Sequence, residues 1–190
     1  MRVADRVIAI ASSTGGTEAL ERIIGELPVT IPPILIVQHM PSGFTKFFAD
    51  RLNSIFPHDI LEAKTGDSLA QGRILLAPAN RHMRIVRQSG KLAVECYTGA
   101  KIHGVMPAAD ILFESVAHVV QANAIGVVLT GMGADGARGL MAMRQSGAST
   151  IGQDRESCVV YGMPKIAKDL GAVEYELPLD KIAQKILSLL

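Results

Sequence analysis

The chain has 190 residues, 48% of them hydrophobic, and its 19 basic and 18 acidic residues leave a formal net charge of +1. This length suits one domain with a single core, and the balanced charge gives no electrostatic reason to expect a nucleic acid or an anionic membrane as partner. The apolar stretches are too short for a bilayer span or a secretory leader, and the two cysteines make neither a disulfide framework nor a metal cluster. These features favour the reducing cytoplasm.

Apolar runs alternate with helical patterns along the chain. Strands are predicted at 7–11, 34–37, 74–77, 124–129, 149–151 and 173–176. Helices are predicted after the first strand with Thr17 as N-cap, after the second strand, from Pro107 as a first-turn proline, at 137–145, at 164–170 and at the C-terminus. Segments 83–87 and 92–96 flank Ser89-Gly90 as a hairpin. The predicted fold is α/β: a doubly wound, mostly parallel sheet with helices on both faces and a β-hairpin insert.

Three polar residues come shortly after predicted strands. Ser13 follows the first strand, His39 follows the second, and Asp135 follows the strand at 124–129. Chemistry in open α/β sheets collects at the carboxyl ends of the strands. A hydroxyl, an imidazole and a carboxylate are the three parts of an acyl-transfer triad, so this placement predicts a hydrolase.

Ser13 lies in a Ser/Thr/Gly-rich turn that leads into a helix, and other interpretations of that turn stay open. Ser12, Ser13 or Thr14 would serve equally as a helix cap, or the loop would hold a phosphate at the helix N-terminus. A P-loop is disfavoured because no lysine follows the glycines. The G-x-S-x-G elbow of α/β-hydrolases is absent, since Ala11 stands two residues before Ser13.

The loop that contains Asp135 also allows a second hypothesis from another functional class. Its segment Gly131-Met-Gly-Ala-Asp-Gly136 fits G-x-G-x-x-G between a strand and a helix, and Asp154 follows 18 residues later (154 − 136). The alternative function is therefore a nucleotide-binding α/β module. Two points oppose it: the Asp135 charge would face a pyrophosphate, and only 36 residues (190 − 154) follow Asp154.

Four segments carry a resemblance to a known family. They are Ala11-Ser-Ser-Thr-Gly-Gly-Thr-Glu18, Gln38-His-Met-Pro-Ser-Gly-Phe-Thr45, Leu129-Thr-Gly-Met-Gly-Ala-Asp-Gly136 and Ser157-Cys-Val-Val-Tyr-Gly-Met-Pro164. In order and spacing they resemble the catalytic domain of CheB-type chemotaxis protein-glutamate methylesterases. The resemblance covers about 7–187, so residues 1–190 are expected to form one methylesterase catalytic domain, with the family's N-terminal receiver domain absent from this chain.

The resemblance implies hydrolysis of glutamate methyl esters on bacterial chemoreceptors, with deamidation of receptor glutamines as a second activity. By position, Ser13 would be the nucleophile, His39 the base and Asp135 the orienting carboxylate. Thr14 and Met132 stand where the family places supporting groups, with the Met132 N–H as an oxyanion donor. The implied partners are methyl-accepting chemotaxis receptors, and no metal or cofactor is implied.

Two positions depart from the family pattern. Ala11-Ser12 replaces the usual Gly-Ala before the nucleophile, and Met106 stands where many members carry arginine. The second hydroxyl makes the choice of Ser13 over Ser12 depend on motif register. Cys158 is expected to be a packed small residue rather than a nucleophile, since no base is assigned to it.

Overall fold

A seven-stranded sheet in the order β3-β4-β2-β1-β7-β8-β9 organises the protein, whose computed structural model describes residues 6–190. All six pairings in this sheet are parallel. The antiparallel hairpin forms a separate two-stranded sheet. The strands are β1 (Val7–Ser12), β2 (Ile34–Gln38), β3 (Asp59–Glu62), β4 (Arg73–Leu76), β5 (His82–Gln88), β6 (Lys91–Tyr97), β7 (Ala124–Val128), β8 (Ser149–Gln153) and β9 (Tyr175–Leu177).

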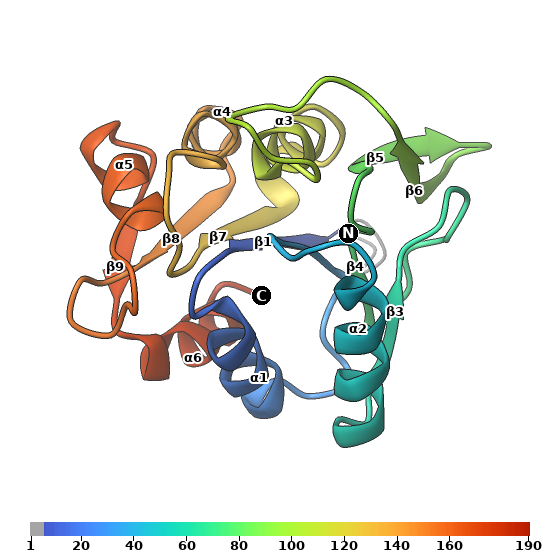
Figure 1. Ribbon diagram of the computed structural model, residues 1–190, viewed down its shortest axis with the longest axis horizontal. Coiled ribbons are helices and arrows are strands. Elements are labelled where there is room, and N and C mark those ends of the chain that lie inside the picture. Colours follow the sequence, from blue (N-terminus) through green and yellow to red (C-terminus); the bar gives the residue numbers. More distant parts are fainter. Residues whose placement is uncertain (1–5) are drawn as a thin grey trace.

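Helices cover both faces of this sheet, as the sequence predicts. The helices are α1 (Gly16–Glu26), α2 (Phe44–Ile55), α3 (Ala109–Val119), α4 (Ala137–Gln145), α5 (Met163–Asp169) and α6 (Leu179–Ser188), with a short 3-10 turn, η2 (Gln121–Asn123). Figure 1 shows α3, α4 and α5 on one side of the sheet and α1, α2 and α6 on the other. None of the helices within residues 6–190 combines the length and apolarity that a bilayer span requires.

Strand β1 shows how the alternating pattern builds two cores. Its small residues Val7, Ala9 and Ala11 face the core beneath α3 and α4, whereas Ile8 and Ile10 face the opposite core, which contains the apolar face of α1. All five side chains are at most 1% exposed. Since successive side chains of a strand point to opposite faces, a continuous apolar run is the pattern of a strand buried on both sides.

The strand order reverses at β1, and this reversal locates the functional edge. The chain passes from β1 outward to β2 and then to the β3–β4 edge, and later returns to place β7 on the other side of β1. In doubly wound sheets ligands bind beyond the carboxyl ends of the strands at such a switch point. The loops that follow β1, β2 and β7 meet there.

Several predicted boundaries were wrong. Thr17 is not an N-cap: α1 begins at Gly16, Gly15 takes the cap position with φ 79°, and the Thr17 hydroxyl bonds to Glu18. Pro107 precedes α3 instead of opening it, and its bond to Met106 is cis. The four-residue edge strand β3, with only Ile60 fully buried, escaped prediction because its pattern is too short.

Helices α3 and α4 pack closely because Gly139 has no side chain. A methyl group at this position would lie 2.6 Å from the Cβ of Phe113 and 2.8 Å from the carbonyl oxygen of Asp110. One atom is a backbone oxygen of α3 and the other is a Cβ fixed to its backbone, so neither can move away unless the two helices separate. The glycine therefore sets the distance between two helices whose N-termini border the functional edge.

Replacing Gly139 by alanine should lower the free energy of unfolding by about 1–3 kcal/mol, the usual cost of overpacking. Gly25→Ala is the matched control, because the added methyl group in α1 meets only the edge of the Phe56 ring, at 3.2 Å. There the higher helix propensity of alanine, worth up to ~1 kcal/mol, should offset the contact. Urea unfolding measures both variants, and equal losses would contradict the close approach at Gly139.

Candidate active site

The three predicted triad residues lie on neighbouring loops at one edge of the sheet. Ser13 directly follows β1, His39 directly follows β2, and Asp135 lies between β7 and α4. Because β1 pairs in parallel with both β2 and β7, the carboxyl ends of these strands share an edge. Residues that are 96 positions apart in the chain, His39 and Asp135, come into hydrogen-bond contact there.

The two adjacent serines have different environments. Ser12 is fully buried, and its hydroxyl donates to Gln38 Oε1 at 2.6 Å. Ser13 is half-buried, and its backbone N–H donates to the Thr130 carbonyl at 3.0 Å. Within the described part of the chain the Ser13 hydroxyl has no hydrogen-bond partner, His39 included. The hydroxyl that can reach a ligand is therefore that of Ser13, and Ser12 has a structural role.

Gly131, in the loop after β7, allows this loop to pack closely against Ser13. A Cβ on Gly131 would lie 2.6 Å from the Cβ of Ser13 and 3.0 Å from its backbone nitrogen. The first glycine of the Gly131–Gly136 loop thus brings the β7 loop next to the serine. This close approach explains the glycine without a bound phosphate.

His39 forms hydrogen bonds through both its backbone and its imidazole ring. Its N–H donates to the Ser12 carbonyl at 3.0 Å, and its Nε2 lies 2.8 Å from Asp135 Oδ2. An ionised carboxylate only accepts hydrogen bonds, so in the neutral imidazole Nε2 carries the proton and Nδ1 has the free lone pair. The imidazole is 13% exposed, which leaves it reachable from solvent.

Asp135 is a buried carboxylate with three N–H donors. Besides His39, the backbone N–H of Ala109 donates to Oδ2 at 2.6 Å and that of Asp110 donates to Oδ1 at 3.0 Å. These amides open α3, so the carboxylate also lies at the positive end of a helix dipole. Burial raises the pKa of Asp135, but the hydrogen bond from His39 and those from the two amides outweigh it, and the net pKa is lowered.

Within residues 6–190, neither of the two predicted supporting residues forms a hydrogen bond with the Ser13 hydroxyl. The Thr14 side chain is exposed, and its carbonyl accepts from the Thr130 hydroxyl at 2.9 Å. Met132 is 74% exposed in the loop after β7. Their proposed role as oxyanion supports stays a prediction. A pocket of about 200 Å³ opens beside His39, between Met40–Ser42 and the turn at 104–107.

Sequence reasoning missed a set of buried polar residues that form hydrogen bonds with backbone groups at the ends of the strands. Gln38 donates through Nε2 to the carbonyls of Ser13, at 2.9 Å, and His39, at 3.0 Å. Gln153 accepts from the Thr130 N–H at 2.8 Å. The available signal was position: each glutamine is the last residue of a strand that the sheet buries, where a buried polar group needs a hydrogen-bond partner.

Neither Cys158 nor the acidic groups near the site offer a different chemistry. Burial raises the pKa of the Cys158 thiol to about 12, which opposes a thiolate nucleophile and agrees with the packed role expected for it. His103, Asp110 and Asp135 have potential metal-ligand atoms within 4.8 Å of one another. Both carboxylates already accept hydrogen bonds from helix N–H groups, so the cluster is explained by helix capping.

The contacts of the two aspartates oppose the nucleotide-binding alternative. Asp135 points toward α3, where it binds backbone amides. Asp154, the residue expected at a ribose, accepts through Oδ1 from the N–H and the hydroxyl of Ser157, at 2.9 and 2.6 Å. With these oxygens engaged inside the protein, the loop pattern is better explained by the close packing at Gly131.

Comparison with known proteins places this α/β chain in a class of hydrolases. A family model described as CheB methylesterase matches residues 8–186. The chain is 50% identical over 186 residues to a "protein-glutamate methylesterase/protein-glutamine glutaminase" of Syntrophotalea carbinolica, covering 98% of this chain and 53% of that protein. A protein of the same name in Bdellovibrio bacteriovorus is 52% identical over 186 residues, covering 98% and 52%.

A solved structure agrees in fold over nearly the whole chain. The CheB methylesterase catalytic domain of Thermotoga maritima superposes with a TM-score of 0.94 at 39% identity, covering 97% of this chain and 98% of that one. The chain belongs to the CheB methylesterase family, and the resemblance carried by the four motifs is confirmed. It spans about half the length of the curated relatives it matches.

The lowered pKa of Asp135 predicts a pH-dependent contribution to stability. Since the folded-state pKa lies below the ordinary value of 3.8, the ionised group stabilises the fold above about pH 4, and this contribution is lost as the pH falls through the folded-state pKa. Asp135→Asn should therefore cost roughly 1–3 kcal/mol at pH 7, and less as the pH falls below 4.

Urea unfolding at pH 7 and at pH 3 measures this difference. Asp50→Asn is the control, because Asp50 is an exposed carboxylate whose one ion pair in the described part of the chain is with Lys46 on the same helix. Such pairs contribute ~0.5 kcal/mol or less. A penalty for Asp135→Asn that is the same at both pH values would show that the charge of Asp135 does not stabilise the fold.

Proposed function

We propose that this chain is a serine hydrolase that removes methyl esters from glutamate side chains of bacterial chemoreceptors and also deamidates receptor glutamines. The observation that carries the proposal is the His39–Asp135 hydrogen bond at the sheet edge where the Ser13 hydroxyl lies, unpartnered among the described residues. The names of the relatives, methylesterase and glutaminase, describe two hydrolyses at the same side-chain carbonyl. One site therefore serves both reactions.

In the proposed reaction Ser13 is the nucleophile and His39 the base. As Ser13 Oγ attacks the ester carbonyl carbon, its proton passes to His39 Nδ1, since Nε2 is engaged with Asp135. Asp135 stabilises the imidazolium and fixes its tautomer. The proton then goes to the departing methoxide, which leaves as methanol, and an acyl-enzyme remains. For a glutamine substrate, the proton goes to the departing amide nitrogen, which leaves as ammonia.

Water completes the cycle. A water molecule gives a proton to His39 as its oxygen attacks the acyl carbon. The second tetrahedral intermediate then expels Ser13 Oγ, which takes that proton back from His39, and the freed glutamic acid loses its remaining proton to solvent. The Met132 N–H, with Thr14 beside the serine, is proposed to bind the oxyanion in both halves of the reaction. Met132 lies in the loop whose Gly131 approaches Ser13, which supports this role.

The surface around the triad suits a substrate carried on another protein. Four large apolar side chains, here called the apolar rim, are the most exposed of their kind among the described residues: Phe44 (58%), Phe47 (74%), Met132 (74%) and Val159 (70%). They lie in the first turn of α2 or in the loops after β7 and β8, at the triad's edge of the sheet. Exposed apolar side chains gathered around a site typically mark a protein-binding surface.

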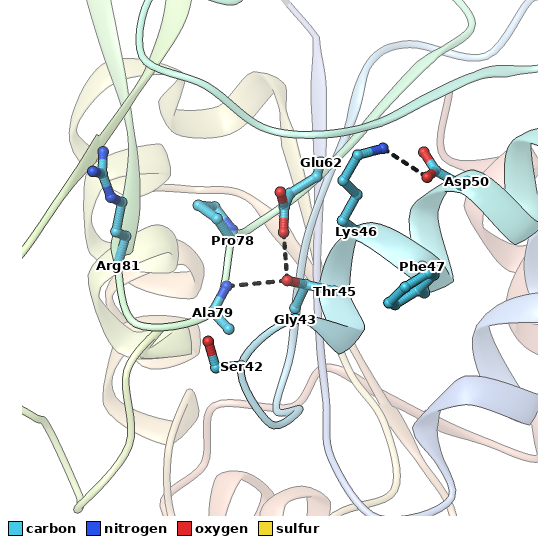
Figure 2. Close-up of a pocket in the computed structure, with 10 residues that line it drawn as sticks. All are labelled: Ser42, Gly43, Thr45, Lys46, Phe47, Asp50, Glu62, Pro78, Ala79 and Arg81. Carbon is cyan, nitrogen blue, oxygen red and sulfur yellow. Dashed lines mark hydrogen bonds and ion pairs between the residues drawn. The ribbon is translucent and has the colours of Figure 1, made fainter.

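A pocket of about 460 Å³ at the start of α2 continues this surface. Figure 2 shows Lys46 and Arg81 on opposite sides of it, with the Thr45 hydroxyl bonded to Glu62 and Ala79 between them. Lys46 pairs with Asp50, whereas Arg81 has no acidic partner within the described residues. This free cation next to the apolar rim favours a substrate with acidic side chains.

We further propose that the chain acts in the cytoplasm as a catalytic unit of chemoreceptor adaptation. A receiver domain of the kind that the resemblance implies would regulate it by covering the triad's edge of the sheet, where the apolar rim lies. The half of the curated relatives' length that this chain does not match leaves room for such a domain in those proteins.

Methanol release from methyl-esterified chemoreceptor tests the reaction and the nucleophile together. Ser13→Ala should reduce the rate by a factor on the order of 10⁶, the effect of losing a triad nucleophile. Ser12→Ala should retain most of the activity, because the Ser12 hydroxyl is committed to Gln38. No release by the folded, unmutated chain would refute the esterase, and equal losses in the two variants would refute the assignment of Ser13.

Changing the apolar rim should weaken substrate binding without altering the chemistry. Phe47→Asp is expected to raise KM for the receptor about tenfold, equivalent to ~1.4 kcal/mol, with kcat unchanged. Hydrolysis of a short peptide with one glutamyl methyl ester should be unaffected. Ile55→Asp, at the other end of α2 and also exposed, is the control. The same KM for both variants would exclude Phe47 from the receptor contact.

A further inference from the structure

The N-terminus of each of the helices α3 and α4 is capped by an aspartate that belongs to the other helix or directly precedes it. Neither helix has a capping hydrogen bond from its own N-cap residue, Ala108 in α3 and Gly136 in α4. Asp135, just before α4, accepts from the first two amides of α3, while Asp110, in the first turn of α3, accepts through Oδ1 from the Gly139 N–H of α4 at 2.8 Å. Both aspartates are at most 2% exposed.

The second oxygen of Asp110 is held by a histidine. His103 Nε2 lies 3.0 Å from Asp110 Oδ2, and Arg138 Nε lies 3.4 Å from the same oxygen. His103 occupies a tight turn with φ 51°, followed by Gly104 with φ 78°, and the turn is closed by two hydrogen bonds between Ile102 and Val105. A left-handed turn of this kind is costly for a non-glycine residue unless the surrounding contacts stabilise it.

We propose that Asp110, held by His103, is a positioning residue for the esterase reaction and acts through Asp135. The backbone N–H of Asp110 is one of the donors that orient the Asp135 carboxylate. Its side chain meanwhile fixes the N-terminus of α4, two residues after Asp135 in the chain. One residue therefore holds both the donor to Asp135 and the backbone that carries Asp135.

The role concerns the orientation of His39, because Asp135 is the only partner of its Nε2 in the described structure. A displacement of α3 relative to α4 would shift the Asp135 carboxylate and rotate the imidazole away from Ser13. Misplacing a reacting group by 1 Å can cost about 10² in rate. The inference rests on the proposed function, since it assigns Asp110 a part in that reaction.

Two substitutions separate positioning from helix capping. Asp110→Asn keeps an oxygen for the Gly139 N–H but replaces Oδ2, which accepts from His103 and Arg138, with an NH2 donor. His103→Asn suits the left-handed backbone, leaves both caps intact, and shortens the side chain so that it no longer reaches Asp110. Glu114→Gln is the matched control: it removes one carboxylate from the same helix, and Glu114 Oε1 lies 4.0 Å from the Arg138 guanidinium.

Kinetics on methyl-esterified chemoreceptor provides the first measurement. Asp110→Asn should lower kcat by ten- to a hundredfold with KM within twofold of the unmutated value. His103→Asn should lower kcat less, because Arg138 still bonds to Asp110. Glu114→Gln should leave both constants unchanged. Folded Asp110→Asn and His103→Asn variants with unaltered kcat, or with a change in KM alone, would overturn the proposal.

Proton NMR of the hydrogen-bonded His39 Nε2–H is the second measurement and does not need turnover. The signal is assigned by its loss in His39→Gln. It should shift or broaden in the Asp110 and His103 variants and stay in place in Glu114→Gln; an unmoved signal in the first two would refute positioning. If the unmutated chain releases no methanol, the proposed function fails by itself, and the NMR comparison still decides whether Asp110 orients the His39–Asp135 pair.

Discussion

The carboxylate of Asp135 connects three parts of the chain that are far apart in sequence. It lies in the loop after β7, bonds to the imidazole that follows β2, and accepts the first two amides of α3. A buried carboxylate without donors would cost several kcal/mol, whereas here a helix N-terminus and a histidine stabilise its charged form. The same hydrogen bonds that make the burial tolerable also orient the histidine, so stability and the proposed chemistry would depend on one group.

Buried polar side chains extend this arrangement across the edge of the sheet. The Gln38 amide bonds to the Ser12 hydroxyl and to the carbonyls of Ser13 and His39, and so ties the ends of β1 and β2 together. The Thr130 N–H donates to Gln153 Oε1 and so joins the ends of β7 and β8, while the Thr130 hydroxyl donates to the Thr14 carbonyl beyond β1. Ser12, a departure from the family pattern, thus has a partner in Gln38. Such a satisfied network makes the loop positions rigid, which the proposed triad, assembled from three loops, would require.

The proposed triad lies at an edge of the sheet that also carries the four exposed side chains of the apolar rim. The apolar rim lies in the segments that follow β2, β7 and β8, at the same edge of the sheet as Ser13 and His39, which are themselves only half-buried. Enzymes for small substrates usually enclose the ligand in a concave pocket. A side chain that projects from a protein instead needs a shallow site and a flanking surface, because the body of the substrate stays outside. The geometry therefore agrees with the side-chain ester that the relatives' names indicate.

Local sequence patterns determined the fold class and the candidate triad. The apolar runs of β1, β2 and β7 are long enough to predict strands buried on both faces, and a parallel sheet places the residues after them at one edge. The short, half-exposed strand β3 lacked such a pattern and was missed. The motif resemblance chose Ser13 by register, and burial of Ser12 against Gln38 supplies the physical reason.

The tertiary structure alone decided the contacts that depend on distant segments. Periodicity placed Asp110 on a helix, but only the packing of α3 against α4 showed it buried and capping the other helix. The N-terminus of α3 is capped by Asp135, 26 residues away in the chain, so no local motif could locate it. Sequence patterns report which residues share a strand or a helix face. Hydrogen bonds between segments far apart in the chain depend on how the elements pack, and three-dimensional coordinates are needed to see them.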